Sequence, residues 1–138
     1  MIEQAAVMST EQTRELIQRY IEEVWNKGNL DLIPELVDPN YIDHSIPFPG
    51  LEGLKEWIQA TSAAFNHQTI IEEQITENHS SALRITMRVK QIGEWRGIAS
   101  SGKEAQTEGF RFYRLENGKI VEHWAHIDGD KLAAQLKS

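Results

Sequence analysis

Apolar side chains recur at helical spacing in the first half of the chain. They form one stripe that comprises Leu16, Ile17, Tyr20, Ile21, Val24 and Trp25. Ser9 and Gln12, before this stripe, have the spacing of a capping box, and Gly28 after it is a residue type that often ends a helix. The pattern therefore predicts an amphipathic helix over residues 10–26.

Two further helical segments are predicted before residue 66. Apolar positions over residues 30–37 indicate one or two short turns, and Pro34 suits the first turn of a helix. A second apolar stripe over residues 54–65 predicts another amphipathic helix. The intervening residues 41–45 are predicted to be extended and to lead into a proline-containing loop.

The spacing changes to alternation after residue 69. Apolar and polar residues alternate over residues 83–90, which predicts a strand with one buried face. Other strands are predicted from residue 69, over about 104–115 and over about 120–128, with a short helix over 131–136. Asn117-Gly118 lies between the last two strands and is typical of a tight hairpin.

Helices come first and strands later, which favours the α+β class over alternating α/β. The few predicted helices can cover only one face of four long strands. A twisted antiparallel sheet covered on one face curls into a cone, and the open end of a cone is a natural pocket. Because no linker divides residues 1–138, we expect one domain, with residues 1–9 as a loose N-terminal extension.

Composition narrows the classes of partner. The chain has 138 residues and a formal net charge of −7, and this charge disfavours nucleic acid as a partner. No apolar run is long enough to span a membrane, and the first residues do not resemble a signal peptide. The absence of cysteine excludes disulfides and agrees with a cytoplasmic location. The net charge says little about small molecules, and a small-molecule substrate is expected from the predicted pocket.

The last predicted strand carries the strongest candidate chemistry. A period of two places Trp124, His126 and Asp128 on one face. An indole, an imidazole and a carboxylate side by side suit a pocket for proton transfer, because apolar walls raise the pKa of a carboxyl group towards neutrality. The alternative is that Asp128 caps the terminal helix and that Trp124 belongs to the core.

His44 is the second candidate for catalysis, and its neighbour Asp43 could orient it. The alternative role for His44 is to fix a loop by a hydrogen bond. A metal site is disfavoured because His123 and His126, three apart on a strand, point to opposite faces. No cofactor is expected.

Candidates for binding the substrate come from several elements. Aromatic rings would favour flat or apolar ligands, and they include Trp25 and Trp57 on the helical stripes and Tyr41 in the extended segment. Arg84 lies on a basic strand face. We expect this face to be solvated or paired at an interface, and the alternative is that Arg84 points into the pocket.

Several motifs, in order along nearly the whole chain, resemble the SnoaL-like polyketide cyclase family of the nuclear-transport-factor-2-like superfamily. They are Tyr20-Ile21-Glu22-Glu23-Val24-Trp25-Asn26-Lys27-Gly28-Asn29, Tyr41-Ile42-Asp43-His44-Ser45, Pro49-Gly50-Leu51-Glu52-Gly53-Leu54-Lys55, Gly97-Ile98 with Ser101-Gly102-Lys103, and Asn117-Gly118-Lys119-Ile120-Val121-Glu122-His123-Trp124 followed by Asp128.

The resemblance implies a conical α+β fold that pairs through its sheet into a homodimer. It also implies cofactor-free aldol ring closure of a polyketide ester, with Asp128 as the acid/base and with His44 and Trp124 lining the pocket. Arg111 and Glu108 depart from the pattern of relatives. If either side chain points inwards, the substrate is not a plain apolar polycycle.

Three hypotheses of function follow. In the first, the protein is an enzyme in which Asp128 abstracts a proton beside a carbonyl while His44, with His126, stabilises the enolate; the reaction is a cyclisation, an isomerisation or a dehydration. In the second, the same pocket only binds a small molecule. The third is an epoxide hydrolase, which needs two carboxylates and an arginine around one water.

Overall fold

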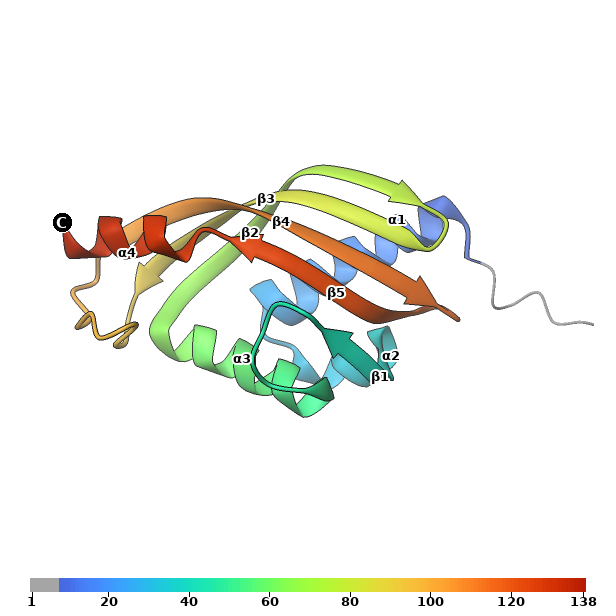
Figure 1. Cartoon of the computed structure of the whole chain (residues 1–138), viewed down its shortest axis with the longest axis horizontal. Coiled ribbons are helices and arrows are strands. Elements are labelled where there is room, and N and C mark those ends of the chain that lie inside the picture. The colour runs from blue at the N-terminus through green and yellow to red at the C-terminus, as the bar shows by residue number, and fades with distance from the viewer. Residues whose placement is uncertain (1–7) are drawn as a thin grey trace, which may run out of the picture.

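A five-stranded mixed sheet forms the frame of the protein in the computed structural model, which describes residues 8–138 (Figure 1). The strand order is β1-β5-β4-β3-β2. The strands are β1 Val37–Asp43, β2 Phe65–Glu77, β3 Ser80–Gln91, β4 Glu104–Glu116 and β5 Lys119–Ile127. Strands β2 to β5 pair antiparallel as predicted, whereas β1 adds a parallel fifth strand beside β5. β1 lies at an edge of the sheet and contains Pro39. Proline has no backbone N–H to donate, and an edge strand tolerates this because one of its sides has no partner strand.

The helices agree with the predicted stripes. They are α1 Thr10–Arg19, a π-helical continuation η1 Tyr20–Asn26, a 3₁₀ turn η2 Leu30–Leu32, α2 Ile33–Leu36, α3 Gly50–Ala64 and α4 Gly129–Lys137. The capping box is confirmed, because Ser9 Oγ accepts from the Gln12 backbone N–H and Gln12 Oε1 accepts from that of Ser9, both at 3.0 Å. Met8 packs on the core, so the expected loose extension does not include Met8 and Ser9; residues 1–7 lie outside the described residues.

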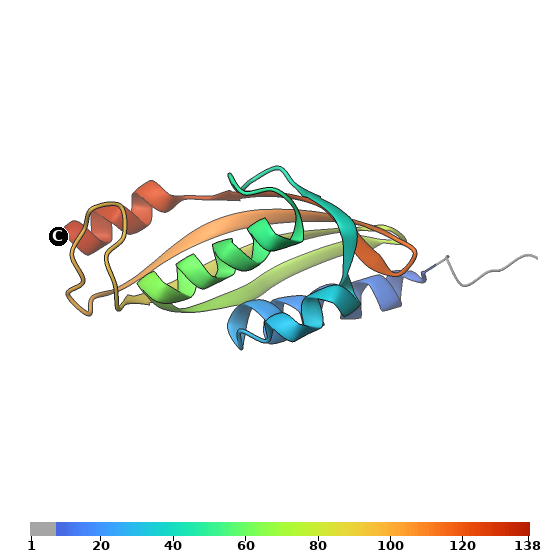
Figure 2. The ribbon, with the colours of Figure 1, turned by 90° about the horizontal axis from the view of Figure 1, so that it is seen from below.

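Helices α1 and α3 cover one face of the curved sheet (Figure 2). The main core lies between them and the sheet and includes Ile17, Val24, Leu54, Ile85 and Leu115. None of the helices in the described part of the chain is long and apolar enough to cross a membrane. The α+β prediction, with helices on one face of a curved sheet, is confirmed.

One extra residue in β5 decides which of its side chains face the helices. The hairpin turn has positive φ at Asn117 and Gly118 (51° and 78°), as a tight two-residue turn requires. Leu115 then pairs with Ile120, but Arg114 pairs with Glu122, so Val121 is a β-bulge. Because of this bulge, Ile120 and His123 are both buried on the helix-covered face although they are three residues apart.

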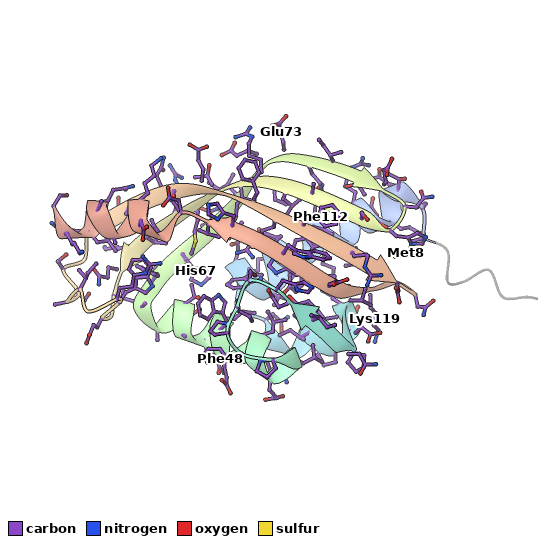
Figure 3. All side chains as sticks on the ribbon, viewed as in Figure 1. Met8, Phe48, His67, Glu73, Phe112 and Lys119 are labelled. Carbon is purple, nitrogen blue, oxygen red and sulfur yellow. The ribbon has the colours of Figure 1, made fainter. Side chains whose placement is uncertain are left out.

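The other face of the sheet carries no helix. In Figure 3, Glu73 projects from this outer face, whereas His67 lies on the side of α3. Large apolar side chains are exposed on the outer face, among them Phe110, Phe112 and Trp124, with exposed fractions of 56%, 40% and 38%. The two faces of the sheet therefore differ in chemistry as well as in cover.

A second, smaller core closes one end of the fold. It is made where α4 and the loop between β3 and β4 come together beside the end of α3 (Figure 1), and its members include Phe65, Val89, Leu132 and Leu136, with Trp95 packed against them. Residues of both cores line the cavity described next.

Candidate active site

A cavity of about 560 Å³ opens on the helix-covered side of the sheet. This volume is within the range of small-molecule pockets. Its walls are rich in aromatic rings, namely Trp25, Trp57, Phe65 and Trp95. Polar and charged groups also reach it, and three of them, Asp43, Arg111 and His123, form one connected cluster. The cavity thus combines flat apolar walls with a connected polar cluster.

A buried Asp–His pair lies at the centre of this cluster. His123 Nδ1 lies 2.9 Å from Asp43 Oδ2, and the two side chains are only 4% and 2% exposed. Asp43 also accepts hydrogen bonds from the hydroxyl of Tyr41 at 2.5 Å and from the backbone N–H and hydroxyl of Ser45 at 2.9 and 2.5 Å. With four donors around it, the carboxylate is held in one orientation and its charge is stabilised.

Arg111 completes the cluster from the neighbouring strand β4. Its Nη1 lies 3.2 Å from His123 Nε2, and its guanidinium carbon lies 5.1 Å from the centre of the Trp25 ring. Since a guanidinium can only donate, Nε2 must accept from Arg111, and the ring proton must then sit on Nδ1 and be donated to Asp43. The contacts on both sides therefore select one neutral tautomer of His123.

The protonation states agree with this arrangement. Burial alone would raise the pKa of Asp43, but hydrogen bonds from His123, Ser45 and Tyr41 outweigh burial and hold that pKa well below its usual range. Burial lowers the pKa of His123, the Asp43 hydrogen bond opposes this, and the positive charge of Arg111 lowers it further; the net shift is downward. Burial raises the pKa of Tyr41, so its hydroxyl stays a donor. His123 is accordingly a neutral base at pH 7 beside a permanent carboxylate.

Packing fixes the imidazole ring as well as its tautomer. Tyr113 stacks on His123 with a centroid distance of 4.5 Å and an interplanar angle of 22°, and Tyr20 meets Tyr113 edge-on at 5.8 Å. Both tyrosines are almost fully buried. A base with a fixed tautomer, a fixed ring plane and a carboxylate behind it is suited to general acid–base chemistry.

The place predicted for Asp128 is wrong. Its side chain is exposed, does not line the cavity, and accepts a hydrogen bond from the Lys131 backbone N–H at 3.0 Å as the N-cap of α4. The alternative weighed for this residue, a helix cap, is confirmed. The physical reason is the strand geometry: the cavity face of β5 carries His123 and Ala125, and β5 ends at Ile127, so Asp128 starts the helix instead of extending the strand.

We expect Asp128→Ala to destabilise the fold by about 1 kcal/mol, because it removes the cap of α4. Asp128→Asn should change stability little, since asparagine caps as well as aspartate does. Urea unfolding of the three proteins measures this. If Asp128→Asn destabilised the protein as strongly as Asp128→Ala, the side chain would have a role beyond capping.

His44 and Trp124 lie outside the cavity, so the predicted pocket lining by these two residues is wrong. Their rings stack on each other with centroids 4.7 Å apart, and His44 Nε2 lies 2.7 Å from Glu122 Oε2. The alternative for His44, a hydrogen bond that fixes a loop, is therefore confirmed. His126 borders the cavity at its rim, but its side chain is exposed.

The remaining predicted residues divide between the cavity and its surroundings. Trp25 and Trp57 line the cavity as expected. Tyr41 does not line it but holds Asp43 from behind. Arg84 faces away from the cavity with a 40% exposed side chain and pairs with Glu73 at 2.8 Å, because it alternates with the buried Leu83 and Ile85. Arg84 therefore lies on a paired surface and does not line the cavity.

The sequence analysis missed His123 as a cavity residue and left Arg111 and Glu108 unplaced. Arg111 points into the cavity and is 8% exposed, whereas Glu108 is exposed outside it. Alternation along β4 was the available signal, since Arg111 shares a face with the buried Tyr113 and Leu115. Among residues 8–138, no three His, Asp or Glu side chains gather in a way that could hold a metal ion.

Comparison with known proteins places this chain in a family. The family model for SnoaL-like polyketide cyclases matches residues 15–136. The chain belongs to the SnoaL-like polyketide cyclase family. The motifs that suggested this resemblance and the fold that it implied are thereby confirmed. A search of curated proteins found no match.

Solved structures from three Streptomyces species share the fold of this SnoaL-like chain. IdmH of Streptomyces antibioticus, described as a "putative polyketide cyclase", is 25% identical with a TM-score of 0.82 over 92% of this chain and 99% of its own. AclR of Streptomyces galilaeus, described as a "putative hydroxylase", is 24% identical with a TM-score of 0.83 over 94% and 98%. TsrD of Streptomyces laurentii is 20% identical with a TM-score of 0.80 over 99% and 98%. These different descriptions on one fold mean that the reaction must be argued from the site.

Proposed function

We propose that this protein is a cofactor-free acid–base enzyme that abstracts a proton beside a carbonyl group in a flat, largely apolar substrate, as in aldol cyclisation or isomerisation. The observation that carries the proposal is the buried His123–Asp43 pair at the wall of an aromatic cavity. His123 takes the part that the sequence analysis gave to Asp128.

The proposed first step breaks a carbon–hydrogen bond of the substrate. His123 Nε2 accepts the proton, and the electron pair of that bond moves through the carbon onto the carbonyl oxygen, which becomes an enolate. The imidazolium that forms donates from Nδ1 to Asp43, which is already ionised and 2.9 Å away. Asp43 is a positioning residue that also compensates the new charge.

Arg111 takes part in the same step. In the resting protein its Nη1 donates to His123 Nε2. Because Nε2 has a single lone pair, Nη1 must turn from it to the carbonyl oxygen of the bound substrate before Nε2 accepts the proton, and it then donates to the enolate oxygen. A donor aimed at charge that develops in the transition state is the usual form of electrostatic catalysis. In a ring closure, the enolate carbon then attacks a second carbonyl carbon, and the alkoxide formed takes the proton back from His123.

The cavity walls favour this chemistry. Trp25, Trp57 and Trp95 present aromatic surface to a flat substrate and exclude water from the enolate. A water-poor site strengthens both the Asp43 and the Arg111 interactions. The nature of the walls thus favours polycyclic or aromatic ketones over small polar ones.

Proton exchange tests the proposal without knowledge of the natural substrate. The probe is 2-tetralone, a bicyclic ketone with exchangeable protons beside its carbonyl. We expect the protein to accelerate replacement of these protons by deuterium in D₂O, followed by proton NMR against a protein-free sample. If a ligand bound in the cavity but its exchange matched the protein-free rate, the protein would be a binding module without catalysis, the second hypothesis above.

The cavity gives no support to an epoxide hydrolase. That reaction needs two carboxylates, and Asp43 is the one carboxylate among the described residues that line the cavity. Its four hydrogen bonds leave it committed to His123, Tyr41 and Ser45.

We also propose that a second copy of the chain covers the outer face of the sheet. Phe110, Phe112 and Trp124 are neighbours there, since Phe112 is the partner of Trp124 in the ladder, and all three are more than one-third exposed. Charges of both signs border this patch, including Arg84 and Glu122. A patch with an apolar centre and a mixed-charge rim can match its own image across a two-fold axis.

Light scattering after gel filtration tests this pairing. We expect a dimer for the wild type and a monomer for Phe112→Lys, because a lysine on each side would place two like charges in the apolar centre. Gln59→Lys is the control, since Gln59 is exposed on α3, which covers the opposite face of the sheet. A wild-type monomer at micromolar concentration would contradict the proposal.

A further inference from the structure

Arg111 is a buried cation whose charge no carboxylate of the described chain neutralises. It is 8% exposed, and among residues 8–138 it forms no ion pair. Its Nη1 contacts a neutral imidazole, and its Nε has no hydrogen-bond partner in the described chain. Buried arginines are normally paired, because an isolated charge away from water is costly.

The other charges at the cavity do not supply the missing anion. Arg96 lines the same cavity but is itself paired with Asp130 at 2.9 Å. Asp43 faces His123 and not Arg111. The positive charge of Arg111 also acts on His67, whose pKa is lowered first by burial and second by Arg111. This local excess of positive charge lies within a chain whose net charge is −7.

We infer that the ligand of this cavity is an aromatic or polycyclic carboxylate, whose anionic group pairs with Arg111 in the ground state. This inference rests on the proposed function and narrows its substrate to a free acid, in place of the ester that the family resemblance implied.

The geometry allows Arg111 to serve both the acid and the reaction. A guanidinium has five N–H donors in one plane, and only Nη1 is engaged with His123. The remaining donors can hold a carboxylate while Nη1 stays available to the enolate oxygen. The ring of Trp25 supports the guanidinium plane from one side. A substrate that carries its carboxylate close to the reacting carbonyl satisfies both demands.

Binding of a matched pair of compounds tests the inference separately from catalysis. The probes are 2-naphthoate and 2-naphthamide, which have the same rings and nearly the same shape but differ in charge. By titration calorimetry we expect the wild type to bind the acid about 10- to 100-fold more tightly than the amide, the range for a hydrogen bond to a charged group. Arg111→Gln should lose this preference and leave the affinity for the amide almost unchanged.

Three further variants complete the design. Arg96→Gln, at the other arginine of the cavity, should keep the preference for the acid. Arg111→Lys should keep part of it, and it provides the comparison if Arg111→Gln does not fold. His123→Asn should keep the preference while it loses proton exchange, so binding and catalysis are read independently.

Equal affinities of the wild type for acid and amide, or no measurable binding of the acid, would overturn the inference. So would a preference for the acid that survives in folded Arg111→Gln. None of these results would alter the proposed proton transfer, which is measured by exchange of the neutral ketone.

Discussion

His123→Asn is expected to lower the rate of 2-tetralone proton exchange by about 10²- to 10⁴-fold, the usual contribution of a general base. The physical reason is that asparagine can place an amide N–H near the position of Nδ1 and keep the hydrogen bond to Asp43, but it offers no basic nitrogen near Nε2. The variant therefore removes the base and preserves much of the surrounding network. Initial rates in D₂O at neutral pD, for both proteins at equal concentration, measure the effect.

His44→Asn is the matched control for this variant. His44 undergoes the same substitution but lies outside the cavity, stacked on Trp124. Its exchange rate should stay within about twofold of the wild type, as expected for a surface substitution away from the site. A large loss in His44→Asn together with normal exchange in His123→Asn would reverse the assignment of the base.

Asp43→Asn is expected to have the second largest effect. The amide keeps the shape of the carboxylate but cannot compensate an imidazolium, and its N–H₂ group no longer favours the Nδ1–H tautomer of His123. We expect exchange to fall by at least about 10²-fold and stability to fall by about 1–3 kcal/mol, because the amide cannot accept all four hydrogen bonds made to the carboxylate and leaves a buried donor unpaired. Exchange kinetics and urea unfolding measure the two effects.

Asp128→Asn carries the same substitution at the residue that the sequence had favoured. Its carboxylate is exposed and caps α4, so both the exchange rate and the unfolding free energy should remain close to wild type. If Asp128→Asn lost exchange and Asp43→Asn did not, the carboxylate at the start of α4 would be the one that matters.

The fold could be predicted from the sequence because its signals are local. The capping box at Ser9, the apolar stripes of α1 and α3 and the Asn117-Gly118 turn each act over a few residues, and each is found as expected. The parallel pairing of β1 with β5 could not be predicted in this way. It joins residues about 80 positions apart, and no local pattern specifies such a partner.

The site was predicted in part, and its error has one main cause. Alternation along the last strand correctly separated Trp124 and His126 from His123 and Ala125, but it could not say which set faces the helices. Alternation counted from the buried Ile120 would place Trp124 and His126 on the covered face. The bulge at Val121 shifts the alternation by one residue, so His123 and Ala125 face the helices instead. The aromatic set therefore looked like the pocket, although it forms the outer face.

The pairing of Asp43 with His123 was likewise beyond the sequence. Asp43 was considered only as a neighbour of His44, to which it is adjacent in the chain. The parallel ladder instead places Asp43 opposite His123, so the carboxylate meets a histidine 80 residues away. Contacts across strands of this kind depend on register, which the sequence did not reveal.

The state of the His123 ring is the central claim, and nitrogen NMR of the imidazole tests it most directly. With ¹⁵N-labelled histidine in a pH titration, the account predicts that His123 carries its proton on Nδ1 and stays neutral as the pH falls below 6.5, because its pKa is lowered from that value. In Asp43→Asn the pKa should fall further. A His123 that is protonated at or above pH 6.5, or that carries its proton on Nε2 when neutral, would contradict the account.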